Sequence, residues 1–164
     1  PRNLAQSFKQ GFKAQRMAGQ ITKGIREKLA AFDLVVERFA SESVQSIQHK
    51  IRNQMFEHEP LSDSYAAWKK RTGKDERILI ADDEYVNAIM YQKIRPLQYR
   101  IGVAKREHKG SGLRMEALMR IHEHGTLDGI PARPHFAPER RRALRKLEQY
   151  MESQRRDAAK SKGL

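Results

Sequence analysis

The sequence has no cysteine among its 164 residues and no long apolar run. The first absence excludes disulfides and thiolate metal sites, and it fits a protein made in the cytosol. The second excludes a membrane helix, which needs about 18 consecutive apolar residues. The basic N-terminus also lacks the apolar core of a secretory signal peptide. We therefore expect no membrane partner.

Hydrophobic residues are scarce as well. They make up 38% of the chain against 32% charged residues, which is polar for a compact globule. A chain of this length can still bury the core of one domain. The remainder is expected in solvated helices, or in arms that bury their surface only against a partner.

Acidic residues are few, and the net charge of +13 is placed unevenly. Residues 1–28 carry seven Lys or Arg against one acid, and residues 138–164 carry nine against four. The intervening residues 29–137 are nearly balanced, with seventeen against fifteen. The two ends would therefore meet a polyanion or an acidic protein face. The alternative is that these charged residues only keep the helices solvated, and that the sign of their charge is incidental.

Sequence signatures of catalysis are missing. There is no P-loop, no Gly-x-Ser-x-Gly and no dinucleotide-binding fingerprint. Asp82, Asp83 and Glu84 cluster carboxylates as metal or acid–base sites do, but nothing pairs them with a base, a nucleophile or a phosphate-binding loop. We interpret them as turn or surface residues, and we expect no catalytic residue, no cofactor and no enzyme activity.

His122-Glu123-His124 is the one cluster that suggests a metal. Two histidines at i and i+2 on a strand face the same way and can ligate Zn²⁺. A site needs further ligands, and the helical spacing of metalloproteases is absent because Thr126 stands three residues beyond Glu123. We therefore expect no bound metal.

The apolar pattern divides the chain into four segments. Residues 1–20 hold two glycines and few large apolar groups, and we expect an arm that becomes helical on a neighbouring molecule. Residues 21–58 form one long helix of roughly 50 Å, which Pro60 ends by pushing Glu59 out of the helical region. Its apolar face steps by three or four residues through Ile21, Ile25, Leu29, Phe32, Val36, Phe39, Ile47, Ile51 and Met55.

Residues 59–137 are expected to fold as a small α+β core. Ile78–Ile80 favours a short strand, and Lys93–Arg95 and Tyr99–Val103 alternate as a hairpin around Pro96–Gln98. A short helix follows near residues 115–122. We therefore predict an α+β fold with a long N-terminal helix and a small antiparallel sheet of three or four strands.

Residues 138–164 are expected to form a basic C-terminal helix and tail, with Pro138 near the first helical position. The candidate contact residues can neutralise phosphates without reading base sequence: Arg140, Arg141, Arg142, Arg145 and Lys146. No zinc finger, helix-turn-helix or RNA-binding aromatic motif accompanies them. A helix that touches DNA and a helix that touches an acidic protein ring fit this pattern equally.

The segment Ile121–Pro138, IHEHGTLDGIPARPHFAP, resembles the signature of tailed-bacteriophage virion-morphogenesis and tail-completion (neck) proteins. That signature has an apolar residue, a histidine and a glycine, then Ile-Pro-Ala-Arg-Pro and an aromatic residue before a terminal helix. Two weaker similarities, Leu61–Lys69 and Tyr99–Val103, stand in the family's order, so the resemblance covers roughly residues 60–145. The signature residues are our interface candidates: His122, Gly125, Ile130, Pro131, Arg133, Pro134 and Phe136.

The prolines of this signature stiffen it before any partner binds. Pro131 and Pro134 fix two φ angles and push Ile130 and Arg133 toward an extended conformation. Arg133 then presents a planar donor fork suited to a carboxylate or to backbone carbonyls, and Gly125 permits a turn that a side chain would hinder. We interpret the segment as a turn that launches the last helix and also presents a subunit contact.

What the resemblance implies is a structural virion protein, made in the host cytoplasm, that forms a homo-oligomeric ring of six copies in the phage neck. Such a ring joins a head-closure or connector protein to a tail-tube or tail-terminator protein, and its lumen passes phage DNA. The competing hypothesis is a free-standing basic nucleic-acid-binding protein.

Overall fold

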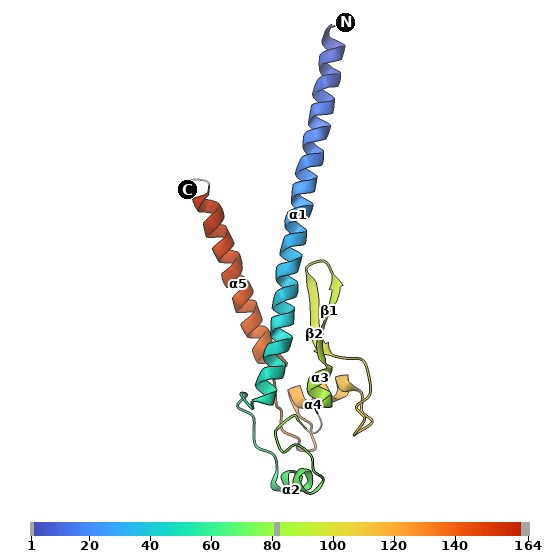
Figure 1. Cartoon of the computed structure of the whole chain (residues 1–164), viewed down its shortest axis with the longest axis vertical. Coiled ribbons are helices and arrows are strands. Elements are labelled where there is room, and N and C mark those ends of the chain that lie inside the picture. Colours follow the sequence, from blue (N-terminus) through green and yellow to red (C-terminus); the bar gives the residue numbers. More distant parts are fainter. Residues whose placement is uncertain (1, 81–82, 162–164) are drawn as a thin grey trace.

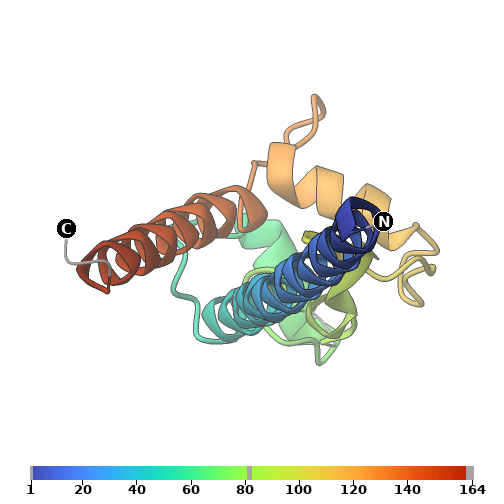
Figure 2. The ribbon, with the colours of Figure 1, turned by 90° about the horizontal axis from the view of Figure 1, so that it is seen from above.

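The computed structural model describes residues 2–80 and 83–161, and it describes the side chains of the first helix at residues 16–17 and from 19 onward. The elements in chain order are α1 (Arg2–Arg52), α2 (Asp63–Arg71), α3 (Glu84–Ala88), β1 (Ile89–Arg95), β2 (Gln98–Val103), α4 (Met115–His124) and α5 (Phe136–Lys160). Figure 1 shows α1 projecting far beyond a small base that contains α2, α3 and α4. From this base α5 runs back on one side of α1, and the hairpin β1–β2 lies on the other (Figure 1, Figure 2).

The long N-terminal helix is confirmed, but its ends differ from those expected. α1 is continuous from Arg2, so the arm expected at residues 1–20 and the helix expected at residues 21–58 form one element as far as Arg52. No proline interrupts residues 2–59, and glycine costs a helix only about 1 kcal/mol relative to alanine. The glycines of the expected arm therefore do not break the helix.

α1 ends at Arg52 because of a left-handed residue that the sequence did not signal. Gln54 has a φ of 51°. The Met55 N–H donates to Lys50 O (2.8 Å) and the Gln54 N–H to Ile51 O (3.1 Å), which are the two bonds of a Schellman motif. Glycine usually takes this position, so a glutamine there gave no warning of a helix end before Pro60.

The hydrophobic core lies at the foot of α1, where that helix meets α3, the start of β1 and α4. Its buried residues are Val44, Ile47, Ile51, Ile80, Tyr85, Val86, Ala88, Ile89 and Met115. Removing their apolar surface from water is the main favourable term in folding. Further up α1 the same face is open to solvent, with Ile21, Ile25 and Leu29 exposed by 61%, 54% and 50%.

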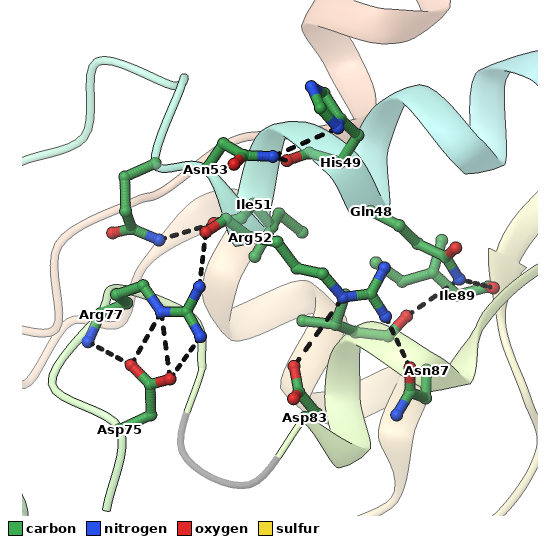
Figure 3. Close-up of polar contacts among 12 residues, drawn as sticks. Gln48, His49, Ile51, Arg52, Asn53, Asp75, Arg77, Asp83, Asn87 and Ile89 are labelled. Carbon is green, nitrogen blue, oxygen red and sulfur yellow. Dashed lines mark hydrogen bonds and ion pairs between the residues drawn. The ribbon is translucent and has the colours of Figure 1, made fainter.

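Polar side chains tie the foot of α1 to the segment between residues 75 and 89 (Figure 3). The Gln48 amide donates to Ile89 O (3.1 Å), where β1 begins. Arg77 pairs with Asp75 and donates to Arg52 O (2.7 Å). These bonds satisfy a carbonyl at the end of α1 and hold the following loop against the helix.

The sheet has two antiparallel strands among the described residues, fewer than the three or four predicted. The hairpin itself is confirmed, with Ile89 opposite Val103 and a two-residue turn at Pro96–Leu97. Asp33 of α1 holds the tip of this hairpin by accepting from the Leu97 N–H (2.7 Å). Asp33 also pairs with Lys93, which lowers the pKa of the Asp33 carboxyl.

Ile78–Ile80 forms a turn and not the strand that the sequence favoured. The Gln54 amide takes both backbone groups of Ile78, accepting from its N–H (2.8 Å) and donating to its carbonyl (3.1 Å). The ammonium of Lys69 donates to Ile80 O (2.5 Å). Side chains thus supply the bonds that a neighbouring strand would have supplied.

The basic C-terminal helix is confirmed as α5, which begins at Phe136, two residues before the expected start. Pro138 stands in its first turn, where a missing N–H breaks no helical bond. Residues 162–164 of the expected tail lie outside the described residues.

Candidate functional site

The signature segment folds back on the end of α4. The Thr126 N–H donates to Ile130 O (2.9 Å), which closes a small loop, and the Arg133 N–H donates to His122 O (2.6 Å). Both bonds join backbone groups, so the path of the chain is set without any partner. The segment then enters α5 directly, as the sequence predicted.

Gly125 is required at the start of this loop. Its φ is 73°, and a Cβ built on it would lie 2.6 Å from Ile130 O and 3.0 Å from Ala132 N. Both neighbours are backbone atoms, so neither can rotate away. The prediction that Gly125 permits a turn closed to other residues is confirmed.

The loop between Gly125 and Pro131 presents apolar side chains to solvent. Leu127 is fully exposed and Ile130 is 45% exposed. Pro131 is half-buried behind them. An apolar tip on a loop braced by backbone bonds can contact a neighbouring protein at little cost in conformational entropy.

Arg133 lies inside the molecule and not at this tip. Arg133 is only 7% exposed. Its Nε donates to Glu59 O (3.3 Å) and its Nη2 donates to Pro60 O (3.2 Å). The sequence suggested that Arg133 binds either a carboxylate or backbone carbonyls. In the described chain its acceptors are the two backbone carbonyls. The fork of Arg133 therefore ties the signature segment to the chain that leaves α1, while Pro134 beside it is exposed.

His135 is the centre of a buried polar cluster. Its Nδ1 lies 2.9 Å from Arg133 O and its Nε2 lies 2.8 Å from the Tyr85 hydroxyl. A carbonyl only accepts, so Nδ1 carries the proton and Nε2 accepts from Tyr85. Burial lowers the pKa of His135 and raises the pKa of Tyr85. Both groups are thus held neutral and fully bonded.

Glu123 forms the N-terminal cap of α5 from outside that helix. Its Oε2 accepts from the N–H groups of His135 (3.1 Å) and Phe136 (3.2 Å), and its Oε1 accepts from the Ala137 N–H (2.8 Å). A carboxylate at this end of a helix satisfies unpaired donors and opposes the positive end of the helix dipole. Glu123 therefore sets where α5 begins.

His122 and His124 do not form a ligand pair, because they lie on α4 and not on a strand. Because they are two residues apart on a helix, they point to different sides. The ring of His122 packs on the ring of Tyr85, with 4.8 Å between the ring centroids, whereas His124 is exposed. Burial, aided by the nearby positive groups, lowers the pKa of His122 to about 3. Nowhere in the described chain do three His, Asp or Glu residues gather as a metal site would.

The acidic run serves the fold where it is described. Asp83 lies 4.0 Å from the guanidinium of Arg52. Glu84 accepts from the Lys109 N–H (2.9 Å) and so holds the loop that follows the hairpin. Asp82 lies outside the described residues.

One face of the basic helix α5 packs against α1. Side chains on this face pair with side chains of α1: Glu139 with Lys50 (2.7 Å), Arg142 with Ser46 (2.8 Å) and Lys146 with Glu42 (3.7 Å). Residue numbers rise along one helix as they fall along the other, so the two helices run antiparallel. Of the five basic contact candidates, Arg142 and Lys146 therefore contact α1, although both of their side chains stay 44% exposed.

The other three candidates, Arg140, Arg141 and Arg145, are exposed. Arg140 and Arg141 line a groove of about 810 Å³ that is bounded by α1, α5 and the hairpin. Apolar side chains form much of its floor and walls: Val36, Phe39, Ala40, Ile101, Phe136, Leu144 and Leu147. The structure thus brings two of the basic candidates and one signature residue, Phe136, to the same apolar groove.

Several residues of this region were not visible to sequence reasoning. Glu123 was noted only as part of a metal motif, because its role depends on backbone groups twelve or more residues away. Lys69 is 2% exposed and donates to two carbonyls, and its burial lowers the pKa of its ammonium. A lysine in a basic stretch gives no sign of this burial.

No family model, curated protein or solved structure matches this chain. In the described part of the chain, none of the helices is both long and apolar enough to cross a membrane.

Proposed function

We propose that this protein is a structural component of a tailed-phage neck, where it joins a head-closure or connector protein to a tail-tube or tail-terminator protein. It acts as a homo-oligomeric ring of six copies that passes DNA, without catalysis, cofactor or metal. It is made in the host cytoplasm and resides in the virion. The proposal begins from the resemblance of Ile121–Pro138 to the neck-protein signature.

One structural observation supports the proposal best. The apolar face of α1 continues beyond the folded base, and Ile21, Ile25 and Leu29 remain half or more exposed. Soluble monomers seldom leave so long a row of large apolar groups in water, and such rows mark surfaces that bind other proteins. The apolar loop tip at Leu127 and the groove beside α5 are further surfaces of this kind.

The test has two parts. Light scattering on the purified chain is expected to show an assembly larger than a monomer. Electron microscopy of lysates from a phage lacking the gene is expected to show separate heads and tails, restored by the gene supplied in trans. A monomeric chain together with intact particles from the deletion strain would rule the proposal out.

The competing function is nucleic-acid binding by the free chain, and the exposed Arg140, Arg141 and Arg145 favour it. It requires tight binding to DNA that weakens steeply with salt. Charge reversal at Arg140 and Arg141 would then abolish function. The neck proposal expects weak DNA affinity and incorporation into particles, so a DNA-binding titration at two salt concentrations separates the two.

A further inference from the structure

We propose that the groove between α1, α5 and the hairpin binds an amphipathic helix with acidic flanks, supplied by a different protein. The inference rests on the proposed joining function, because it names the chemistry of one joined partner.

The shape of the groove suits a helix. Its floor is α1, which Figure 1 shows as a nearly straight rod, and its walls are α5 and β2. The two walls lie on different sides of α1 because they bind different faces of that helix. Glu42 and Ser46 face α5, whereas Asp33 and Glu37 bind the hairpin. The face of α1 between them is not covered by either wall. A third helix could pack on it at the usual interaxial distance of about 8–10 Å.

The floor is apolar and extends past the walls. Val36 and Phe39 line the groove, and Phe32, Leu29, Ile25 and Ile21 continue the same row at spacings of three or four residues. At 3.6 residues per turn this spacing keeps all of them on one face of α1. A bound helix would therefore lie in the groove and continue along the exposed part of α1.

The exposed charged side chains that line the groove are positive. Glu123 and Glu139 also line the groove, but Glu123 caps α5, and Glu139 is 4% exposed and paired with Lys50. Glu139 is thus paired with a cation, and the Glu123 carboxylate is occupied by the N–H groups of α5. Arg140 and Arg141 line the groove and are exposed. Residues 16–28 of α1 add four basic residues against one acid.

This charge selects the occupant. The exposed row on α1 of a second copy is also apolar and helical, but it would bring the basic residues 16–28 against Arg140 and Arg141. Like charges at an interface suppress pairing, and opposite charges steer it. A helix with Leu, Ile or Met along one face and Glu or Asp beside that face satisfies both the floor and the rim.

The experiment uses the chain of residues 1–164 and a labelled synthetic helix of about 18 residues, with leucine at helical spacing and glutamate on both flanks. Fluorescence anisotropy at about 150 mM salt is expected to show saturable binding of one peptide per chain. A matched peptide with lysine in place of glutamate should not bind. Arg140→Glu with Arg141→Glu should weaken the acidic peptide about tenfold or more and allow the basic peptide to bind.

Two further variants separate the groove from net charge. Arg155→Glu with Arg156→Glu makes the same charge change on the same helix outside the groove, and should leave affinity within about twofold. Leu144→Gln removes an apolar wall residue that is 49% exposed, and should weaken binding, whereas Leu34→Gln, 67% exposed on another face of α1, should not. Because all these positions are exposed, the fold should tolerate each change.

Three results would overturn the inference: no saturable binding, equal binding of both peptides, or equal loss from the two arginine pairs. Self-association that Leu144→Gln abolishes would also overturn it, by assigning the groove to a second copy. Peptide binding measures the groove alone, and the deletion phage measures the joining role. Binding without a joining defect would therefore refute the neck function and leave the groove in place.

Discussion

Single residues decide whether the signature segment can fold, and Gly125 is the clearest of them. Its positive φ and the backbone atoms around it leave no room for a side chain. Gly129 in the same loop also has a positive φ, 95°, but a Cβ there would meet nothing within 4 Å. Comparing substitutions at the two glycines therefore separates the energetic cost of a positive φ from the energetic cost of a steric clash.

Gly125→Ala is expected to lower the free energy of unfolding by about 2–4 kcal/mol, because it adds a collision to a strained angle. Gly129→Ala should cost only about 1 kcal/mol, from the angle alone. Urea unfolding followed by circular dichroism measures both. Equal losses would show that the contact with Ile130 O is not what restricts residue 125.

Buried histidines make the stability depend on pH. The pKa of His122 is about 3 in the folded chain against an ordinary 6.5. The unfolded chain therefore takes up this proton first as the pH falls. The stability contributed by neutral His122 is complete above about pH 6.5 and is lost progressively toward pH 3. Burial also lowers the pKa of His135 and His58, which adds to the same trend.

His122 alone should lower the free energy of unfolding by about 2 kcal/mol between pH 7 and pH 5. His122→Leu removes one titrating group and a buried Nδ1 that has no hydrogen-bond partner among the described residues. Its stability should therefore fall less steeply with acid than that of the unaltered chain. His124→Leu, on the exposed side of α4, should leave the slope unchanged; urea titrations at several pH values give it.

Specific hydrogen bonds set two of the helix ends, from a side chain outside the helix at α5 and from the local backbone at α1. Glu123 supplies the cap of α5, and the Schellman bonds at Gln54 end α1. Neither boundary follows from helix propensity. Both explain why the sequence placed these helices correctly and their ends less so.

Glu123→Gln is expected to destabilise the chain by about 1–2 kcal/mol, since an amide loses the charge that opposes the helix dipole and can accept through only one oxygen. The amide protons of residues 135–137 should exchange faster with solvent, which nuclear magnetic resonance can follow. Glu148→Gln, an exposed carboxylate on α5, serves as control and should change neither quantity. Unchanged exchange at residues 135–137 would contradict the capping role.

At the scale of the whole molecule, stability and binding surface occupy different parts. The core residues of α1 lie between Val44 and Ile51, and the row from Ile21 to Leu29 is solvent-exposed. The base can therefore fold without the outer half of α1. That half is free to contact other molecules along its length (Figure 1).

Deleting residues 1–28 should shift the Tm of the dilute chain by less than about 2 °C, because few apolar contacts are lost. Affinity for the acidic peptide should fall, because the apolar row that extends the groove floor is gone. Differential scanning calorimetry and fluorescence anisotropy of the labelled peptide check the two statements. A large fall in Tm at monomeric concentrations would show that the outer half of α1 supports the base.

The apolar pattern alone determined the helical character of α1, the hairpin and the basic terminal helix, because burial of one face imposes a period that any reader of the sequence can see. The need for glycine at residue 125 was visible for a similar local reason. The turn at Ile78–Ile80, the burial of Arg133 and the cap from Glu123 were decided by tertiary structure. Each depends on a hydrogen bond between residues far apart in the chain. A local sequence pattern does not predict which distant donor or acceptor will form that bond. The groove beside α5 likewise exists only once α1, α5 and the hairpin have packed together.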